Sequence, residues 1–109
     1  MNPRAFQLAT TGGPEVLEYK EATLGKPGPG EALVRHNAVG LNYIDTYQRS
    51  GLYPMQLPCG LGLEAAGVVI DVGEEVTRFK PGERVMGFFD YGAFAEEAVI
   101  EEKNLMHVP

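Results

Sequence analysis

The sequence is poor in cysteine, and Cys59 is the one thiol among its 109 residues. A single cysteine excludes an internal disulfide, and it also excludes a metal site built from several thiolates. Pro58 and Gly60 flank Cys59. We therefore expect this cysteine to be an ordinary loop residue rather than a reactive thiol.

Basic residues are also scarce in this chain. Nine Lys and Arg stand against fifteen Asp and Glu, which gives a formal net charge of -6. A surface with this charge repels a phosphate backbone and offers no general attraction to an anionic membrane. We therefore expect neither nucleic acid nor a membrane as a partner.

Long hydrophobic runs are missing as well. The longest, residues 65–70, is too short to span a bilayer, and the N-terminus lacks the continuous apolar segment of a signal peptide. These features predict a cytoplasmic protein. The hydrophobic content of 44% and charged content of 22% are typical of a globular chain. The length suits one domain with one core, which we assign to residues 1–109.

Glycine and proline are plentiful: 14 Gly and eight Pro divide the chain into short segments rich in Val, Ile, Tyr and Phe. This pattern predicts a mainly β domain with strands at 4–8, 17–22, 31–39, 65–72, 84–88, 93–100 and 105–108. His36 shares a predicted strand face with Ala32 and Val34, so we interpret it as a structural histidine. Several short strands with one or two short helices favour a partly open barrel over a flat sheet.

The residues after Gly40 change from strand periodicity to helix periodicity. Asn42 is a suitable N-cap, and Gly51 ends the predicted helix. Tyr43 and Ile44 are predicted to be core residues.

A second face of the same helix carries charge. Asp45, three residues after the cap, completes a capping arrangement that is worth about 1 to 2 kcal/mol. Asp45 and Arg49 are also four residues apart, which predicts a favourable ion pair on the helix surface.

Five blocks of sequence together resemble the N-terminal GroES-like domain of the medium-chain dehydrogenase/reductase superfamily, and they lie at 12–17, 29–35, 40–45, 62–67 and 79–85. The similarity is closest to the zinc-independent, ζ-crystallin-like quinone oxidoreductases. It spans nearly the whole chain in the order of the family. The resemblance implies a GroES-like, partly open β-barrel.

Zinc-dependent members of the superfamily carry a cysteine near position 42 and a Gly-His-Glu triplet at 62–64, because zinc takes thiolate, imidazole and carboxylate ligands. Here those positions hold Asn42, Leu63 and Glu64. An amide and a leucine cannot replace a thiolate and an imidazole, so the resemblance implies an enzyme without zinc. Glu64 alone is kept, either as a charged residue at a strand entrance or as a functional residue.

In the resembling enzymes the start of this helix borders the cleft that holds the nicotinamide cofactor. The resemblance therefore assigns Asn42, Asp45 and Tyr47 to cofactor binding and Tyr53 to the substrate pocket. Helix capping also explains Asn42 and Asp45, and both roles can coexist at a cleft edge. Tyr53, in a loop rich in Gly and Pro, is the catalytic candidate, as a hydrogen-bond donor to the acceptor oxygen.

Residues 60–65 match the G-x-G-x-x-A dinucleotide fingerprint. That fingerprint requires a strand before it and a helix after it. Here a proline-containing loop precedes the match and a predicted strand follows it. We interpret the glycines as residues that permit a tight loop.

The resemblance implies hydride transfer from NADPH to a quinone or conjugated carbonyl acceptor, with NADPH bound between this domain and a Rossmann domain. Residues 1–109 contain no predicted Rossmann domain, so we expect a catalytic-domain fragment that is inactive alone. The expected partners are a quinone-like substrate, the Rossmann domain and, as a candidate, a second copy in a homodimer. Two alternatives stay open: a stand-alone GroES-like binding or assembly module, and a fragment of an enal or enoyl double-bond reductase.

Overall fold

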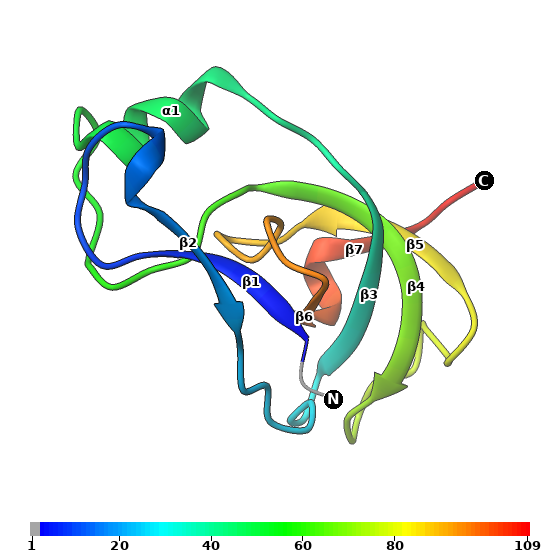
Figure 1. Ribbon diagram of the computed structural model, residues 1–109. Helices are drawn as coiled ribbons and strands as arrows, with labels where there is room; N and C mark the ends of the chain where they lie inside the picture. Colours follow the sequence, from blue (N-terminus) through cyan, green and yellow to red (C-terminus); the bar gives the residue numbers. More distant parts are fainter. Residues whose placement is uncertain (1–2) are drawn as a thin grey trace.

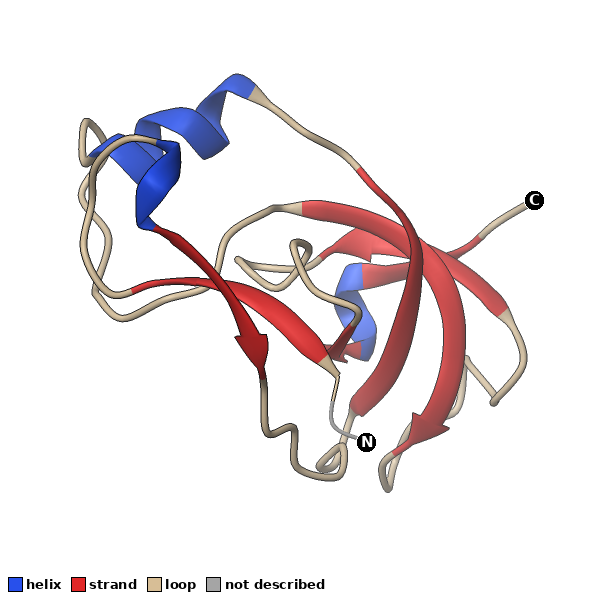
Figure 2. Ribbon diagram, in the orientation of Figure 1, coloured by secondary structure: helices blue, strands red, loops and turns tan. Residues whose placement is uncertain are grey.

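The computed structural model describes residues 3–109, and strands dominate them (Figures 1 and 2). The elements in chain order are β1 Arg4–Leu8, η1 Pro14–Val16, β2 Leu17–Glu21, β3 Glu31–Val39, α1 Tyr43–Ser50, β4 Glu64–Val72, β5 Arg84–Phe88, β6 Glu97–Glu101, η2 Glu102–Asn104 and β7 Leu105–His107. The prediction of a mainly β domain with few, short helices is confirmed. No helix in the part of the chain that the structure describes has the length and apolar character needed to cross a membrane.

The main sheet has five antiparallel strands in the order β6-β3-β4-β5-β7, and β1 and β2 form a separate hairpin. The edge strands β6 and β7 are separated in sequence by η2 alone. In a flat sheet these edges would lie about 19 Å apart. Four residues of extended chain reach only about 14 Å. The sheet must therefore curl, and Figure 1 shows β3 and β4 bending together.

The curled sheet remains open, because β6 and β7 each pair on one side only. The prediction of a partly open barrel is thus confirmed. The core lies on the concave side, where alternate residues of the strands are buried because successive strand side chains point to opposite faces. Its buried members are Ala32, Val34, Ala65, Val69, Phe79, Val85, Phe89, Ala93, Ala98, Ile100 and Leu105.

Helix α1 lies beyond one end of β3, away from the centre of the sheet (Figure 1). The chain reaches it through Gly40, Leu41 and the N-cap Asn42. Gly51 ends it with φ of +92°, a left-handed conformation that glycine adopts without strain. The predicted helix and both its ends are confirmed.

Two predictions about strand bounds and burial are wrong. The strand expected at 93–100 begins only at Glu97. Residues 93–96 instead form a loop whose main chain makes hydrogen bonds to β1 and to Leu61. In that loop the Phe94 N–H donates to the Leu61 carbonyl, and the Phe94 carbonyl accepts from the Phe6 N–H, both at 2.9 Å. Tyr43 is 83% exposed rather than part of the core, because the buried face of α1 is its polar one.

Candidate functional site

A cleft of about 1010 Å³ opens where β3 ends and β4 begins, and it continues over β5 and β7. Most of its wall is apolar or backbone, with Val39, Leu63, Met86, Phe88 and Met106 among the lining side chains. Its polar lining consists of Asn42, Glu64 and Asn104. Small-molecule sites are typically concave and apolar with a few polar groups, and the lining of this cleft has that composition.

Asn42 lies at the edge of this cleft because it caps α1. Its main-chain N–H donates to Asp45 Oδ2 at 2.8 Å, and the Asp45 N–H donates to the Asn42 carbonyl at 3.0 Å. These bonds satisfy main-chain groups at the helix start. The predicted capping role of Asp45 is confirmed, and the Asn42 side chain remains exposed beside the cleft.

Asp45 itself does not line the cleft, because its side chain is only 2% exposed. Gln48, one turn later, is 4% exposed, and its Nε2 donates to the Tyr91 hydroxyl at 3.5 Å. Asp45 Oδ1 and Gln48 Oε1 have no partner among the described residues. The inner face of α1 is therefore polar and rests on the loop that carries Tyr91.

Sequence reasoning missed Gln48 and Tyr91. The spacing of three between Asp45 and Gln48 places them on one helix face, but the apolar pattern of the helix pointed to the opposite face as the buried one. The predicted ion pair between Asp45 and Arg49 is wrong. Arg49 Nε instead donates to the Gly12 carbonyl at 3.1 Å, and the Gly12 N–H donates to the Arg49 carbonyl at 2.8 Å.

Glu64 stands at the start of β4, on the cleft wall, and its carboxylate folds across Gly40. A Cβ at position 40 would overlap Glu64 Oε1, so only glycine leaves room for this arrangement. The Gly40 N–H also donates to the Glu64 carbonyl at 3.1 Å. No ion pair or side-chain hydrogen bond within residues 3–109 engages the Glu64 carboxylate.

The structure brings Tyr47 and Tyr53 together. Their ring centroids are 5.3 Å apart with the rings tilted by 64°, an edge-to-face contact. The Tyr53 N–H donates to the Tyr47 carbonyl at 3.1 Å, and the Tyr53 side chain is 49% exposed. Within residues 3–109 the lining of the cleft includes Asn42 but neither tyrosine.

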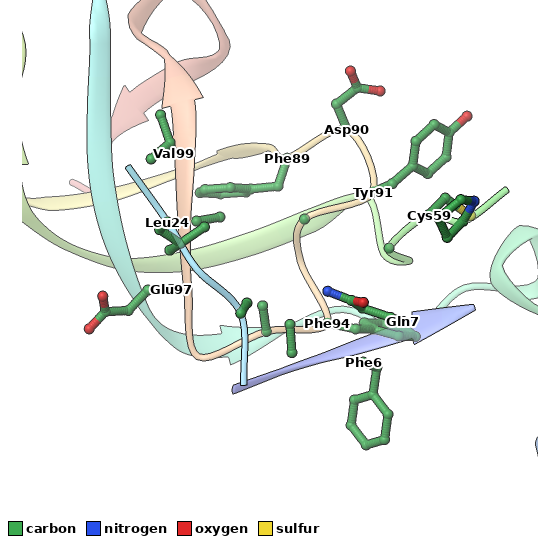
Figure 3. A pocket seen from close by; sticks show the side chains of 17 residues that line it. Phe6, Gln7, Leu24, Cys59, Phe89, Asp90, Tyr91, Phe94, Glu97 and Val99 are labelled. Atoms are coloured by element: carbon green, nitrogen blue, oxygen red, sulfur yellow. The ribbon is translucent and has the colours of Figure 1, made fainter. Parts of the chain in front are cut away.

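A second pocket, of about 480 Å³, lies between β1, β6 and the loops at 58–60 and 89–95 (Figure 3). Phe89 and Leu24 lie together in it, while the carboxylates of Asp90 and Glu97 point outward (Figure 3). None of the predicted site residues lines it. Cys59 does, and partial burial raises the pKa of its thiol above the ordinary value, which lowers its reactivity at neutral pH.

His36 has the contacts of a packing residue, as the sequence predicts. Its Nε2 lies 3.1 Å from the Gly92 carbonyl, and its ring meets Phe89 edge-on at 4.5 Å. Burial lowers the pKa of His36, against the opposing effects of the Gly92 hydrogen bond and the charge of Glu97.

Metal ligands do not gather in the part of the chain that the structure describes: no three His, Cys, Asp or Glu side chains could hold one ion together. At the cleft, Asn42, Leu63 and Glu64 occupy the three positions that hold zinc ligands in zinc-dependent members of the superfamily. Of these three side chains, Glu64 is the one that zinc ordinarily takes as a ligand.

Comparison with known families matches residues 28–109 to the alcohol dehydrogenase GroES-like domain. The chain belongs to this family. It is 54% identical over 108 residues to a quinone oxidoreductase from Pseudomonas aeruginosa, which covers 97% of this chain and 33% of that protein. The crystal structure of the Escherichia coli quinone oxidoreductase complexed with NADPH is 42% identical with a TM-score of 0.93, over 97% of this chain and 33% of that one.

A 2-haloacrylate reductase from Burkholderia sp is 40% identical over 90% of this chain and 31% of its own length. The chain thus spans only about a third of the length of each of these relatives. In the Gly60 to Ala65 segment, a loop precedes β4 and no helix follows, so the context of a dinucleotide fingerprint is absent there.

Proposed function

We propose that the chain is the N-terminal catalytic-domain part of an NADPH-dependent quinone oxidoreductase that works without zinc. The observation that carries the proposal is the cleft at the start of α1: an apolar wall whose exposed amide, Asn42, stands at the mouth. The likeness to the quinone oxidoreductases of P. aeruginosa and E. coli supports it. On this proposal, the cofactor-binding Rossmann domain lies outside residues 1–109.

NADPH would supply the hydride, and the residues of this chain would hold and orient the reactants. The apolar wall around Val39 and Met86 suits the face of a flat ring and excludes water from it. The Asn42 amide can donate to or accept from a carboxamide group. Asp45, being buried, acts on the cofactor through Asn42, whose position it fixes.

The two tyrosines serve the acceptor side in this proposal. Tyr53 presents a hydroxyl that can donate to the carbonyl oxygen of a quinone. Tyr47 packs edge-on against it and limits its rotation. Tyr47 is exposed on the outer face of α1, and it is also our candidate for a contact with the cofactor.

The test is a chimera in which residues 1–109 replace the matching N-terminal third of the P. aeruginosa quinone oxidoreductase. Oxidation of NADPH by 1,4-benzoquinone, followed by absorbance, should proceed with the chimera and not with the 109-residue chain alone. Tyr53→Phe should lower kcat/KM of the chimera by about tenfold, the cost of one hydrogen bond to the reacting oxygen. A folded chimera without turnover would overturn the proposal and favour a stand-alone binding module.

A second candidate is reduction of a conjugated double bond. The likeness to the 2-haloacrylate reductase favours it. The same chimera separates the two, because 2-chloroacrylate and 1,4-benzoquinone can be compared at equal concentration. We expect the quinone to be the better acceptor. The homodimer and the cytoplasmic location remain proposals, which size measurement and imaging of the whole protein would test.

A further inference from the structure

The cleft at the start of α1 carries a single charged side chain. Glu64 is the one acidic residue among the described residues that line the cleft. No Lys, Arg or His lines the wall within residues 3–109. A charged ring bound in the cleft would therefore interact with one negative side chain, Glu64, and with no positive side chain of the wall.

The position of this carboxylate is determined by the backbone. Glu64 begins β4, where its carbonyl accepts the Gly40 N–H at 3.1 Å. The Glu64 side chain is exposed to solvent but lies over the bare Cα of Gly40, and a Cβ at position 40 would displace it. Asn42, two residues after Gly40 in the chain, lines the same wall of the cleft. The Glu64 carboxylate thus shares the wall of the cleft with the exposed Asn42, and no ion pair among the described residues neutralises it.

We propose that Glu64 makes the cleft charge-selective, so that it binds a cationic aromatic ring in preference to a neutral one and a neutral ring in preference to an anionic one. The occupant to which we commit is a pyridinium ring. Its charge complements Glu64, its face suits the apolar wall, and Asn42 can pair with a ring carboxamide. This proposal deepens the proposed function and rests on it only for the natural ligand.

For a hydride-transferring enzyme this selectivity has a direct meaning. NADPH loses a hydride, which carries two electrons, and its nicotinamide changes from a neutral ring to a pyridinium cation. A quinone gains the hydride and takes a proton from solvent to become a hydroquinone. Glu64 would favour the cationic ring, and so would tighten binding of the oxidised cofactor relative to the reduced one.

The first experiment uses the 109-residue chain and three probes of nearly equal shape: 1-methylnicotinamide, a cation; nicotinamide, neutral; and nicotinate, an anion. Each is titrated at low salt while the amide NMR signals of Gly40, Asn42 and Gly87 are followed. We expect the cation to bind about three- to tenfold more tightly than the neutral probe, with nicotinate weakest. This is the range for unit charges about 6 Å apart at a solvent-exposed site, where the effective dielectric constant is about 40 to 80. Added salt should reduce the differences.

Two variants separate the position of the charge from its mere presence. Glu64→Gln removes the charge and should bring the three affinities within about twofold of one another. Gly40→Ala keeps the charge but displaces the carboxylate, and should reduce the preference partway. Glu21→Gln is the matched control, because Glu21 ends β2 outside the cleft. It removes the same charge and should leave the order intact. The NMR spectrum of each variant reports whether it is folded.

A cation preference that survives Glu64→Gln, an equal loss in Glu21→Gln, or no movement of the cleft amides with any probe would overturn the proposal. In the chimera, Glu64→Gln should weaken NADP⁺ binding about three- to tenfold more than NADPH binding, measured by fluorescence without an acceptor. An active chimera with no charge order defeats this inference and leaves the proposed function standing. If the 109-residue chain prefers the cationic probe but the chimera is inactive, this inference stands and the proposed function fails.

Discussion

At the scale of single residues, the start of α1 shows how one carboxylate can serve a helix and a cleft together. Asp45 Oδ2 accepts the Asn42 N–H, and this bond fixes the residue that stands at the cleft mouth. The cap is therefore a structural requirement that also positions a candidate ligand-binding amide. This is why capping and ligand binding, which compete as explanations when only the sequence is known, are compatible in the structure.

Asp45→Ala tests the capping role. The substitution removes the acceptor for the Asn42 N–H and should lower the free energy of unfolding of the 109-residue chain by about 1 to 2 kcal/mol. Chemical denaturation followed by circular dichroism measures it. Asp45→Asn keeps an oxygen acceptor and should retain most of the stability, so equal losses in the two variants would contradict the assignment.

His36 predicts how stability depends on pH. Burial lowers the pKa of His36 in the folded state below its unfolded value, so the unfolded chain binds a proton more readily. The stability that depends on a neutral His36 is fully present above the pKa of the unfolded state, about 6.5. This stability is lost as the pH falls from there toward the lower pKa of the folded state.

The measurement is the free energy of unfolding against pH for the wild type and for His36→Gln, whose amide can still donate to the Gly92 carbonyl. The wild type should lose more stability than His36→Gln between neutral and mildly acidic pH. Parallel pH profiles would show that burial of His36 has no such effect.

At the scale of elements, α1 presents its polar face inward and its aromatic face outward. Gln48 connects the inner face to Tyr91, in a loop where Asp90 and Tyr91 both have positive φ, at 44° and 70°. Non-glycine residues adopt such angles only when their surroundings hold them there. The restraints on this loop include the Gln48 contact, the close packing of Gly60 against the Tyr91 carbonyl, and the Gly92 N–H, which donates to the Phe89 carbonyl at 2.8 Å.

A double-mutant cycle over Gln48→Met and Tyr91→Phe measures the coupling between α1 and this loop. The bond is long, 3.5 Å, so we expect a coupling of about 0.5 kcal/mol, at the low end for a neutral hydrogen bond. Gln48→Met also removes an unpartnered buried oxygen, so its own cost should be small. Strictly additive effects would mean that the helix and the loop are not coupled through this contact.

At the scale of the whole molecule, large apolar side chains are exposed outside the cleft as well as in it. Leu41, Tyr43 and Leu52 are all exposed, and none of them lines the cleft. A surface of this kind on a small protein usually marks a place where another protein surface packs. In the proposed enzyme that surface belongs to the rest of the chain.

The 109-residue chain alone should therefore self-associate as its concentration rises, and the chimera should do so less, because its remaining two-thirds cover the exposed residues. Analytical ultracentrifugation measures both. The double variant Leu41→Ser/Leu52→Ser should shift the 109-residue chain toward the monomer. A 109-residue chain that stays monomeric at every concentration, with no dye binding to its apolar surface, would contradict the proposed covering.

The sequence predicts the fold well where local signals and tertiary packing agree. The bounds of β3 and the two ends of α1 follow from alternation, the cap residue and the terminal glycine. Prediction fails where tertiary contacts decide the outcome. Residues 93–96 alternate like a strand but bond to β1 and to Leu61, and α1 buries its polar face because a loop with a tyrosine hydroxyl lies beneath it.

The candidate site is predictable in part for the same reason. Asn42 and Glu64 can be aligned with a known pattern of residues, but the folding of Glu64 over Gly40 depends on two strands that are distant in sequence. Similarly, the contact between Tyr47 and Tyr53 follows from the course of the loop after Gly51, which residue propensities do not specify.

The sheet order has a consequence for the synthesis of the protein. Residues 31–35 of β3 pair with residues 97–101 of β6, so one margin of β3 stays without hydrogen-bond partners until the last part of this segment leaves the ribosome. An unpaired β margin is a site for wrong association between nascent chains. The domain cannot complete its sheet during translation of about its first nine-tenths, and chaperone protection would matter most in that interval.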